Sequence, residues 1–217
     1  MKNNADDTKN RILDSAEELF AEGGFDGVSA RDITKHAKCN VASINYYFGG
    51  KDSLYNEICR RRLNALRDIR IDSINKVMAQ GDGVTLEELF RAFSHAFLAP
   101  LLEDPKGRSF LKLMTREMLY PHMSAGLLVE ELIMPVFKLL VEAICKICPG
   151  LSTENAVWSV HSLIAQLIHT IHIQTMMGDS LKGLPQFDVS EAVDHIVSFT
   201  AAGVRSLIEN NEDSENV

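Results

Sequence analysis

The chain has 217 residues, of which 46% are hydrophobic and 24% charged, a balance typical of a globular protein with an apolar core. The first ten residues contain no apolar run, and no stretch reaches the roughly eighteen uninterrupted apolar residues of a membrane span. We therefore expect neither a signal peptide nor a transmembrane helix. The four cysteines are too few and too scattered for a disulfide framework, which favours a reducing cytoplasm.

The net charge of −8 is unusual for a protein that contacts DNA, but the charge is unevenly distributed. Residues 1–70 contain 12 Lys and Arg against 11 Asp and Glu, whereas residues 71–217 contain 10 against 19. Phosphate contact depends on local charge, so only the N-terminal part is suited to approach DNA.

The apolar residues recur at helical spacing and strand signals are nearly absent, which predicts an all-α fold. The first helix should end at Gly23-Gly24, a glycine pair suited to a left-handed cap. Ser29 and Asp32 resemble a capping box that opens a helix over 30–37, and Asn40 should cap a helix over 41–47. Further helices are expected at 52–79, 85–99, 107–120, 126–147, 153–177 and 189–209.

Proline punctuates the second half of the chain. Pro105, Pro121, Pro149 and Pro185 fall in the gaps between the expected helices. Pro135 lies inside the 126–147 segment, and we expect it to kink that helix or split it in two.

Only Lys38-Cys39, with Asn40 as cap, joins the second and third helices, which is the spacing of a helix-turn-helix. We expect the apolar members of this pair to pack together and against the first helix; they are Ile33, Ala37, Val41, Ile44 and Phe48. Ser43, Asn45 and Tyr46 would then point outward beside the small Ala42.

Small and polar side chains on a recognition helix can approach base edges, and Asn can pair with adenine. Tyr46, Tyr47, Lys51 and Ser29 are spaced to reach phosphates. The predicted DNA-binding residues are therefore Ser29, Asn40, Ala42, Ser43, Asn45, Tyr46, Tyr47 and Lys51. The alternatives are that Tyr47 only packs and that Lys51 is an ordinary solvated charge.

Residues 9–57 resemble the TetR family of bacterial transcriptional repressors. The resemblance is carried by Ile12–Phe20, Gly24–Ile33, Ile44–Phe48 and Lys51–Tyr55, in that order. It implies a DNA-binding domain over 1–52 and a helical ligand-binding and dimerisation domain over 53–217. One departure is Ala37-Lys38-Cys39-Asn40, where the family often has Ala-Gly-Val-Ser, so the target sequence is expected to differ.

The C-terminal half is rich in Phe and Met, which suit a reshapable apolar pocket. Its segment Arg116–Pro121, with Ile133–Pro135, is loosely similar to one TetR subgroup. We predict a pocket for a small, mainly apolar ligand, lined by Phe93, Phe97, Met114, Met118, Phe137 and Trp158. Arg116, His161 or Gln166 would fix a polar group of that ligand. The alternative is a plain core.

Broad apolar stripes mark the last two helices, and the resemblance implies that they form a four-helix dimer interface. A homodimer would read a pseudo-palindromic operator in double-stranded DNA. Ligand would favour a different spacing of the two DNA-binding domains, transmitted by the long fourth helix, and so release the operator.

Alternative functions remain open. Cys145 and Cys148 form a C-x-x-C, followed by His161, His169 and His172, from which a metal- or thiol-responsive regulator could be built. A helical protein-protein adaptor and a C-x-x-C oxidoreductase are two further alternative functions. No nucleophile elbow, phosphate loop, zinc-protease or dinucleotide motif is present, so we expect a regulator without a cofactor rather than an enzyme.

Overall fold

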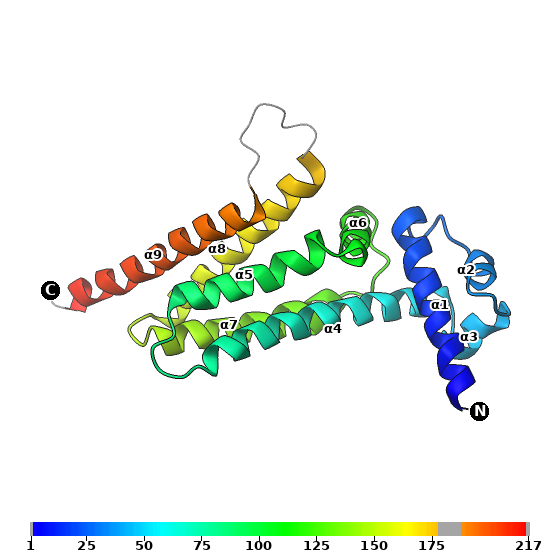
Figure 1. The fold of residues 1–217 in the computed structure, drawn as a ribbon, viewed down its shortest axis with the longest axis horizontal. Helices are drawn as coiled ribbons and strands as arrows, with labels where there is room; N and C mark the ends of the chain where they lie inside the picture. The colour runs from blue at the N-terminus through cyan, green and yellow to red at the C-terminus, as the bar shows by residue number, and fades with distance from the viewer. Residues whose placement is uncertain (1, 178–187, 216–217) are drawn as a thin grey trace. The chain divides into compact units, whose positions relative to one another are not determined.

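The computed structural model describes residues 2–177 and 188–215, and side chains within 6–175 and 188–208. Throughout these ranges the regular structure is helical, without strands (Figure 1). The elements are α1 (Lys2–Gly23), α2 (Ala30–His36), α3 (Ala42–Phe48), α4 (Lys51–Met78), α5 (Leu86–Leu102), α6 (Pro105–Leu119), the π-helical turn η1 (Val129–Ile133), α7 (Met134–Ile147), α8 (Thr153–His172), the π-helical turn η2 (Ile173–Met177) and α9 (Val189–Glu215). The all-α prediction is confirmed. Pro185 lies outside the described residues.

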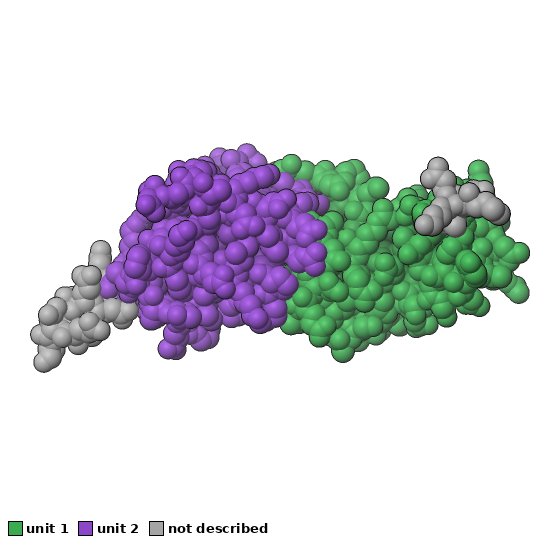
Figure 2. All heavy atoms as spheres, turned by 90° about the horizontal axis from the view of Figure 1, so that it is seen from below, with its two compact units in different colours: residues 1–65, 103–132 green, residues 66–102, 133–217 purple. Residues whose placement is uncertain are grey.

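The chain divides into two compact units, coloured separately in Figure 2. Unit 1 comprises residues 1–65 and 103–132, and unit 2 comprises residues 66–102 and 133–217. This division differs from the predicted boundary between residues 52 and 53. The physical reason is that α6 packs on α1, so a segment distant in sequence joins the N-terminal helices.

Unit 1 is built around α1, whose Ile12, Ala16 and Phe20 are fully buried. The predicted capping box at α2 is present: the Asp32 amide donates to the Ser29 hydroxyl at 3.2 Å, and the Ser29 amide donates to the Asp32 carboxylate at 3.0 Å. This pair satisfies two backbone donors at the helix start. The sequence therefore located this helix correctly to within one residue.

The turn from α2 to α3 has the hydrogen bonds of a Schellman motif. The Cys39 amide donates to the Thr34 carbonyl at 3.0 Å, and the Lys38 amide donates to the Lys35 carbonyl at 3.3 Å. Lys38 occupies the left-handed position with φ of +52°, where glycine is usual. The glycine expected from the family is thus replaced by lysine at a position that strains any side chain.

Unit 2 packs α5 and α8 against α9, and α7 against α8. Its core contains many of the apolar residues of the two C-terminal stripes; buried among them are Leu163, Leu167, Val193, Ile196, Val197 and Val204. The exposed large apolar side chains of the same helices are Trp158, Ile168 and Phe199. The predicted stripes therefore serve mainly the core of this unit, and a smaller set faces outward.

Proline acts on the helices in two ways. The prediction for Pro135 is confirmed: the π-helical turn η1 immediately precedes α7, in whose first turn Pro135 lies. Proline lacks an amide donor and clashes with the preceding turn, so the regular helix restarts there. The fifth helix was expected to end near residue 99, and α5 continues three residues further, through Pro100 to Leu102. None of the described helices is long and apolar enough to cross a membrane.

Candidate nucleic-acid interface

One face of α3 and its leading residue is exposed to solvent. The Tyr46 side chain is 82% exposed and Val41 is 46% exposed, and Ala42 and Asn45 are exposed beside them. Ile44, on the opposite face, is 1% exposed and holds α3 in the core of unit 1. These four exposed residues, hereafter the α3 face, follow the i, i+4 spacing of a helix surface.

The prediction that Val41 packs in the core is wrong. Val41 precedes Asn45 by four residues, so the two share one side of the helix. Val41 was grouped with Ile44 because both are apolar and three residues apart, and its position beside the outward-facing Asn45 was not considered. Ile44 is the buried residue of α3. Val41 is therefore a candidate contact for the methyl group of thymine.

Three of the predicted DNA-binding residues are engaged in local structure. The Asn40 side-chain carbonyl accepts a hydrogen bond from the Ala42 amide at 2.9 Å, and α3 begins at Ala42 rather than at Val41. Ser43 is half-buried. Ser29 and Asp32 bond each other, and this hydrogen bonding lowers the pKa of the Asp32 carboxyl. The side chains of Ser29 and Asn40 thus cap the starts of α2 and α3, and both residues remain exposed.

Aromatic and basic side chains follow the α3 face. The rings of Tyr46 and Tyr47 meet edge to face with centroids 4.9 Å apart, and Tyr47 is half-buried. The ammonium group of Lys51, the first residue of α4, lies 4.0 Å from the centroid of the Phe25 ring. This cation–π contact holds the Lys51 ammonium over Phe25, and the Lys51 backbone lies at the junction of α3 and α4. Gly49, with φ of +80°, makes that junction tight.

Two family models match this chain. The model for bacterial regulatory proteins of the tetR family covers residues 12–58, which include the helix-turn-helix. The model for the tetracyclin repressor-like C-terminal domain covers residues 91–203, just over half of the chain. The chain belongs to the TetR family. Both models describe regulatory proteins, so the expectation of a TetR-type regulator rather than an enzyme is confirmed.

Curated relatives share mainly the DNA-binding part of this TetR-family chain. It is 49% identical over 51 residues to the probable HTH-type transcriptional regulator YttP of Bacillus subtilis, covering 24% of this chain and 25% of YttP. It is 35% identical over 68 residues to the biofilm operon negative transcriptional regulator IcaR of Staphylococcus aureus, covering 31% of this chain and 37% of IcaR. The matches thus span well under two thirds of either relative.

Solved structures extend the likeness to the whole fold. A Mesorhizobium loti protein described as a TetR-family transcriptional regulator superposes with a TM-score of 0.68 at 16% identity. The alignment covers 91% of this chain and 95% of that protein. At this identity the likeness establishes the shared fold, with its N-terminal helix-turn-helix and larger helical C-terminal part.

The residues predicted to line a ligand pocket are divided between the two units. Phe93 and Phe97 are buried on α5 of unit 2, with ring centroids 5.9 Å apart. In the same unit the rings of Phe137 and His161 are 4.9 Å apart, and Trp158 is 62% exposed. Gln166 donates to the Thr200 hydroxyl at 3.1 Å. The other three residues belong to unit 1; they are Met114, Arg116 and Met118.

Two of those unit 1 placements correct the prediction. Met118 is 86% exposed, so it lines no pocket within its unit. Arg116 caps the C-terminal end of α1: its guanidinium donates to the Ala21 carbonyl at 3.2 Å and to the Glu22 carbonyl at 2.8 Å. These carbonyls have no partner within the helix, and a cation also favours the negative end of the helix dipole. Nothing in the local sequence indicates this long-range role.

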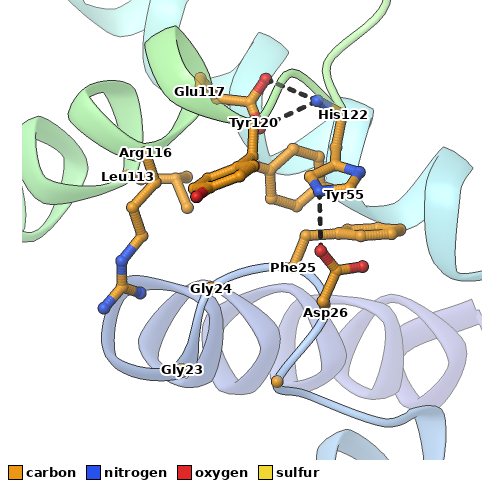
Figure 3. A pocket seen from close by; sticks show the side chains of 11 residues that line it. Gly23, Gly24, Phe25, Asp26, Tyr55, Leu113, Arg116, Glu117, Tyr120 and His122 are labelled. Atoms are coloured by element: carbon orange, nitrogen blue, oxygen red, sulfur yellow. Dashed lines mark hydrogen bonds and ion pairs between the residues drawn. The ribbon is translucent and has the colours of Figure 1, made fainter.

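Unit 1 contains a hollow of about 270 Å³ beside the end of α1 (Figure 3). Its walls include Phe25, whose ring stacks on His122 with centroids 4.4 Å apart, and His122 pairs with Asp26 at 3.1 Å. The Tyr55 hydroxyl donates to Glu117 at 2.6 Å, and burial with this hydrogen bond raises the Tyr55 pKa. The polar groups of the hollow are therefore largely satisfied by one another.

The cysteines do not form a metal cluster within the described residues, where no group of three or more His, Cys, Asp or Glu side chains is suited to hold a metal ion. Cys145 and Cys148 are both free and half-buried. Burial raises the pKa of the Cys148 thiol, which lowers the fraction of reactive thiolate. His161, His169 and His172 are exposed on α8.

Proposed function

We propose that this chain is a ligand-responsive transcriptional regulator of the repressor type, which binds a pseudo-palindromic DNA operator as a homodimer. The observation that carries the proposal is the α3 face: four exposed residues on the second helix of a helix-turn-helix, within the segment matched by the TetR family model. A short helix supported from behind by Ile44 leaves this face free to enter a major groove. The naming of IcaR as a negative regulator is consistent with repression.

The residues of the α3 face and those around it take different roles in the proposal. Val41, Ala42 and Asn45 meet base edges, where a paired Asn–adenine contact contributes about 1–3 kcal/mol of discrimination. Tyr46, Tyr47 and Lys51 contact phosphates, with Ser29, Asn40 and Ser43 at the helix starts. The Lys51 ammonium, held over Phe25 at 4.0 Å, is ordered before DNA arrives, which lowers the entropic cost of a phosphate contact.

The proposed dimer forms through α8 and α9, which pack on each other. Ile168 is 54% exposed and Phe199 is 65% exposed, although both are large and apolar. Covering such side chains with a second copy of the chain removes apolar surface from water. A dimer places two recognition helices on successive major grooves, and the second contact gains from effective concentration.

Paired substitutions test the DNA-binding roles. Lys51→Ala should weaken binding to every sequence and reduce the slope of log K against log salt by about 0.9, the effect of one phosphate contact. Asn45→Ala should instead relax the preference for one base pair of the operator. Lys76→Ala, an exposed lysine in the last turn of α4, is the matched control and should leave binding unchanged.

Fluorescence anisotropy with the full-length protein measures these effects on a cognate operator and on operators with single base changes. An equal loss on all sequences for both variants would contradict the separate roles. Phe199→Glu tests the interface: light scattering after size exclusion should show a monomer and operator affinity should fall. A dimer that persists in this variant would contradict the α8–α9 interface.

A further inference from the structure

Arg70 is a buried cation for which the described residues provide no counter-ion. It lies in the second half of α4, within unit 2, and is 6% exposed. Its guanidinium carbon lies 3.8 Å from the centroid of the Phe97 ring, and its Nε has no hydrogen-bond partner. Other arginines of the unit are paired at the surface: Arg91 with Asp194, and Arg205 with Glu87 at 2.7 Å.

Ser94 presents a second unpaired polar atom close to Phe97 in sequence. It is fully buried on α5, three residues before Phe97 and therefore on the same side of that helix. A serine inside a helix commonly donates to the carbonyl four residues earlier, as the Ser159 hydroxyl does to Asn155 at 2.7 Å. The Ser94 hydroxyl, by contrast, has no hydrogen-bond partner in the part of the chain that the structure describes.

Burial of the Arg70 guanidinium and the Ser94 hydroxyl without hydrogen-bond partners lowers the stability of the folded protein. A buried charge without a partner loses its hydration and gains little in return, and the Phe97 ring offsets only part of that loss. Burial accordingly lowers the pKa of Arg70 to about 9. An apolar residue of the same length would avoid the cost, so the position calls for a function other than stability.

We propose that Arg70 and Ser94 form the anion-binding end of a ligand site in unit 2, and that the ligand is an organic monocarboxylate with an apolar body. The proposal rests on the proposed function, because it names the chemical class of the regulator's effector. The carboxylate would receive charge-assisted hydrogen bonds from the guanidinium, which exceed the cation–π contact with Phe97 that it now makes. The apolar body would pack on the α5 phenylalanines, Phe90 and Phe93.

A single negative charge fits this end of the site better than two. One guanidinium neutralises one charge, and the Ser94 hydroxyl, on the Phe97 side of α5, would add a neutral hydrogen bond. A phosphate dianion would leave a second charge buried and unpaired, at a large desolvation cost. An alcohol or amine of the same body would leave Arg70 unpaired or face it with a like charge.

The test uses full-length wild type, Arg70→Met, Ser94→Ala and the surface control Arg91→Met. Melting is followed without ligand and with a panel of straight-chain acids from hexanoate to dodecanoate, together with benzoate and phenylacetate. The matched straight-chain alcohols and amines serve as controls. Comparing the straight-chain acids with the aromatic acids shows whether the site prefers an alkyl or an aromatic body on the carboxylate. Operator binding by wild type is measured in parallel, so that failure of DNA binding is read separately from failure of ligand binding.

Without ligand, Arg70→Met should melt higher than wild type by at least about 2–4 °C, since it removes the unpaired charge, whereas Arg91→Met should not. At about 100 times its Kd, at least one acid should raise the wild-type melting temperature by about 5–10 °C and weaken operator binding. Its affinity should fall about 30-fold or more in Arg70→Met, less in Ser94→Ala and not in Arg91→Met.

Four results would overturn the inference. Arg70→Met could melt lower than wild type, which would make Arg70 a structural residue. The whole panel of acids could leave wild type unchanged. An acid that binds could retain its affinity in Arg70→Met, or the matched alcohol could bind as well. Either result would show that Arg70 does not bind a carboxylate.

Discussion

Replacing Lys38 by glycine should stabilise unit 1, because Lys38 holds the left-handed position of the Schellman turn between α2 and α3 with φ of +52°. A residue with a side chain pays about 1–2 kcal/mol for this conformation. Glycine avoids that cost, but its greater freedom in the unfolded chain offsets about 0.5–1 kcal/mol of the gain. The expected net effect is a stabilisation of about 0.5–1 kcal/mol, or a rise of about 1–4 °C in melting temperature.

Lys35→Gly is the matched control, because Lys35 is exposed in the last turn of α2 and the substitution removes the same charge. Glycine inside a helix costs about 1 kcal/mol relative to alanine, so this variant should be less stable than wild type. Urea unfolding followed by circular dichroism measures both variants, and their m-values should remain equal to that of wild type. If Lys38→Gly destabilised the protein as Lys35→Gly does, the argument from backbone strain would be refuted.

Three more predictions concern unit 1. Tyr55→Phe should cost about 1–3 kcal/mol in urea unfolding, because the buried hydroxyl bonds Glu117 at 2.6 Å; an unchanged midpoint would contradict this. Arg116→Met should lower stability by about 1 kcal/mol by leaving the last carbonyls of α1 uncapped, and hydrogen exchange of α1 amides should show the fraying. The pKa of Asp32 is lowered in the folded state, so its capping contribution is complete above the unfolded pKa of about 3.9 and is lost as pH falls through the lower folded pKa. Asp32→Asn should therefore flatten the decline of stability below about pH 4, and an unchanged decline would show that Asp32 does not carry it.

Local signals in the sequence predicted most of the helical framework. Ser29 with Asp32 marked the start of α2, Gly23-Gly24 marked the end of α1, and Pro135 marked the break before α7. Each of these acts over a few residues, through an amide that is capped, freed or missing. This is why their effects could be derived without knowing the tertiary packing.

The errors share the opposite character, because they depend on direction or on distant partners. Val41 was assigned to the core from its apolar side chain, but its phase on the helix turns it outward. Arg116 reaches carbonyls about 95 residues away in sequence. The absence of a partner for Arg70 is likewise a property of the packed unit, since its sequence neighbours offer acidic residues on either side at Asp68 and Asp72.

The central claim is that the α3 face reads a specific DNA sequence. The most direct test incubates the full-length protein with fragments of the genome that encodes it, recovers and sequences the bound fragments, and measures their affinity across a salt series. The account predicts one enriched pseudo-palindrome with half-sites about 10–10.5 base pairs apart or a multiple of this, bound by a dimer with a steep salt dependence. Val41→Ala combined with Asn45→Ala should abolish the enrichment. Fragments that share no sequence, bound equally by wild type and by this variant, would contradict the claim.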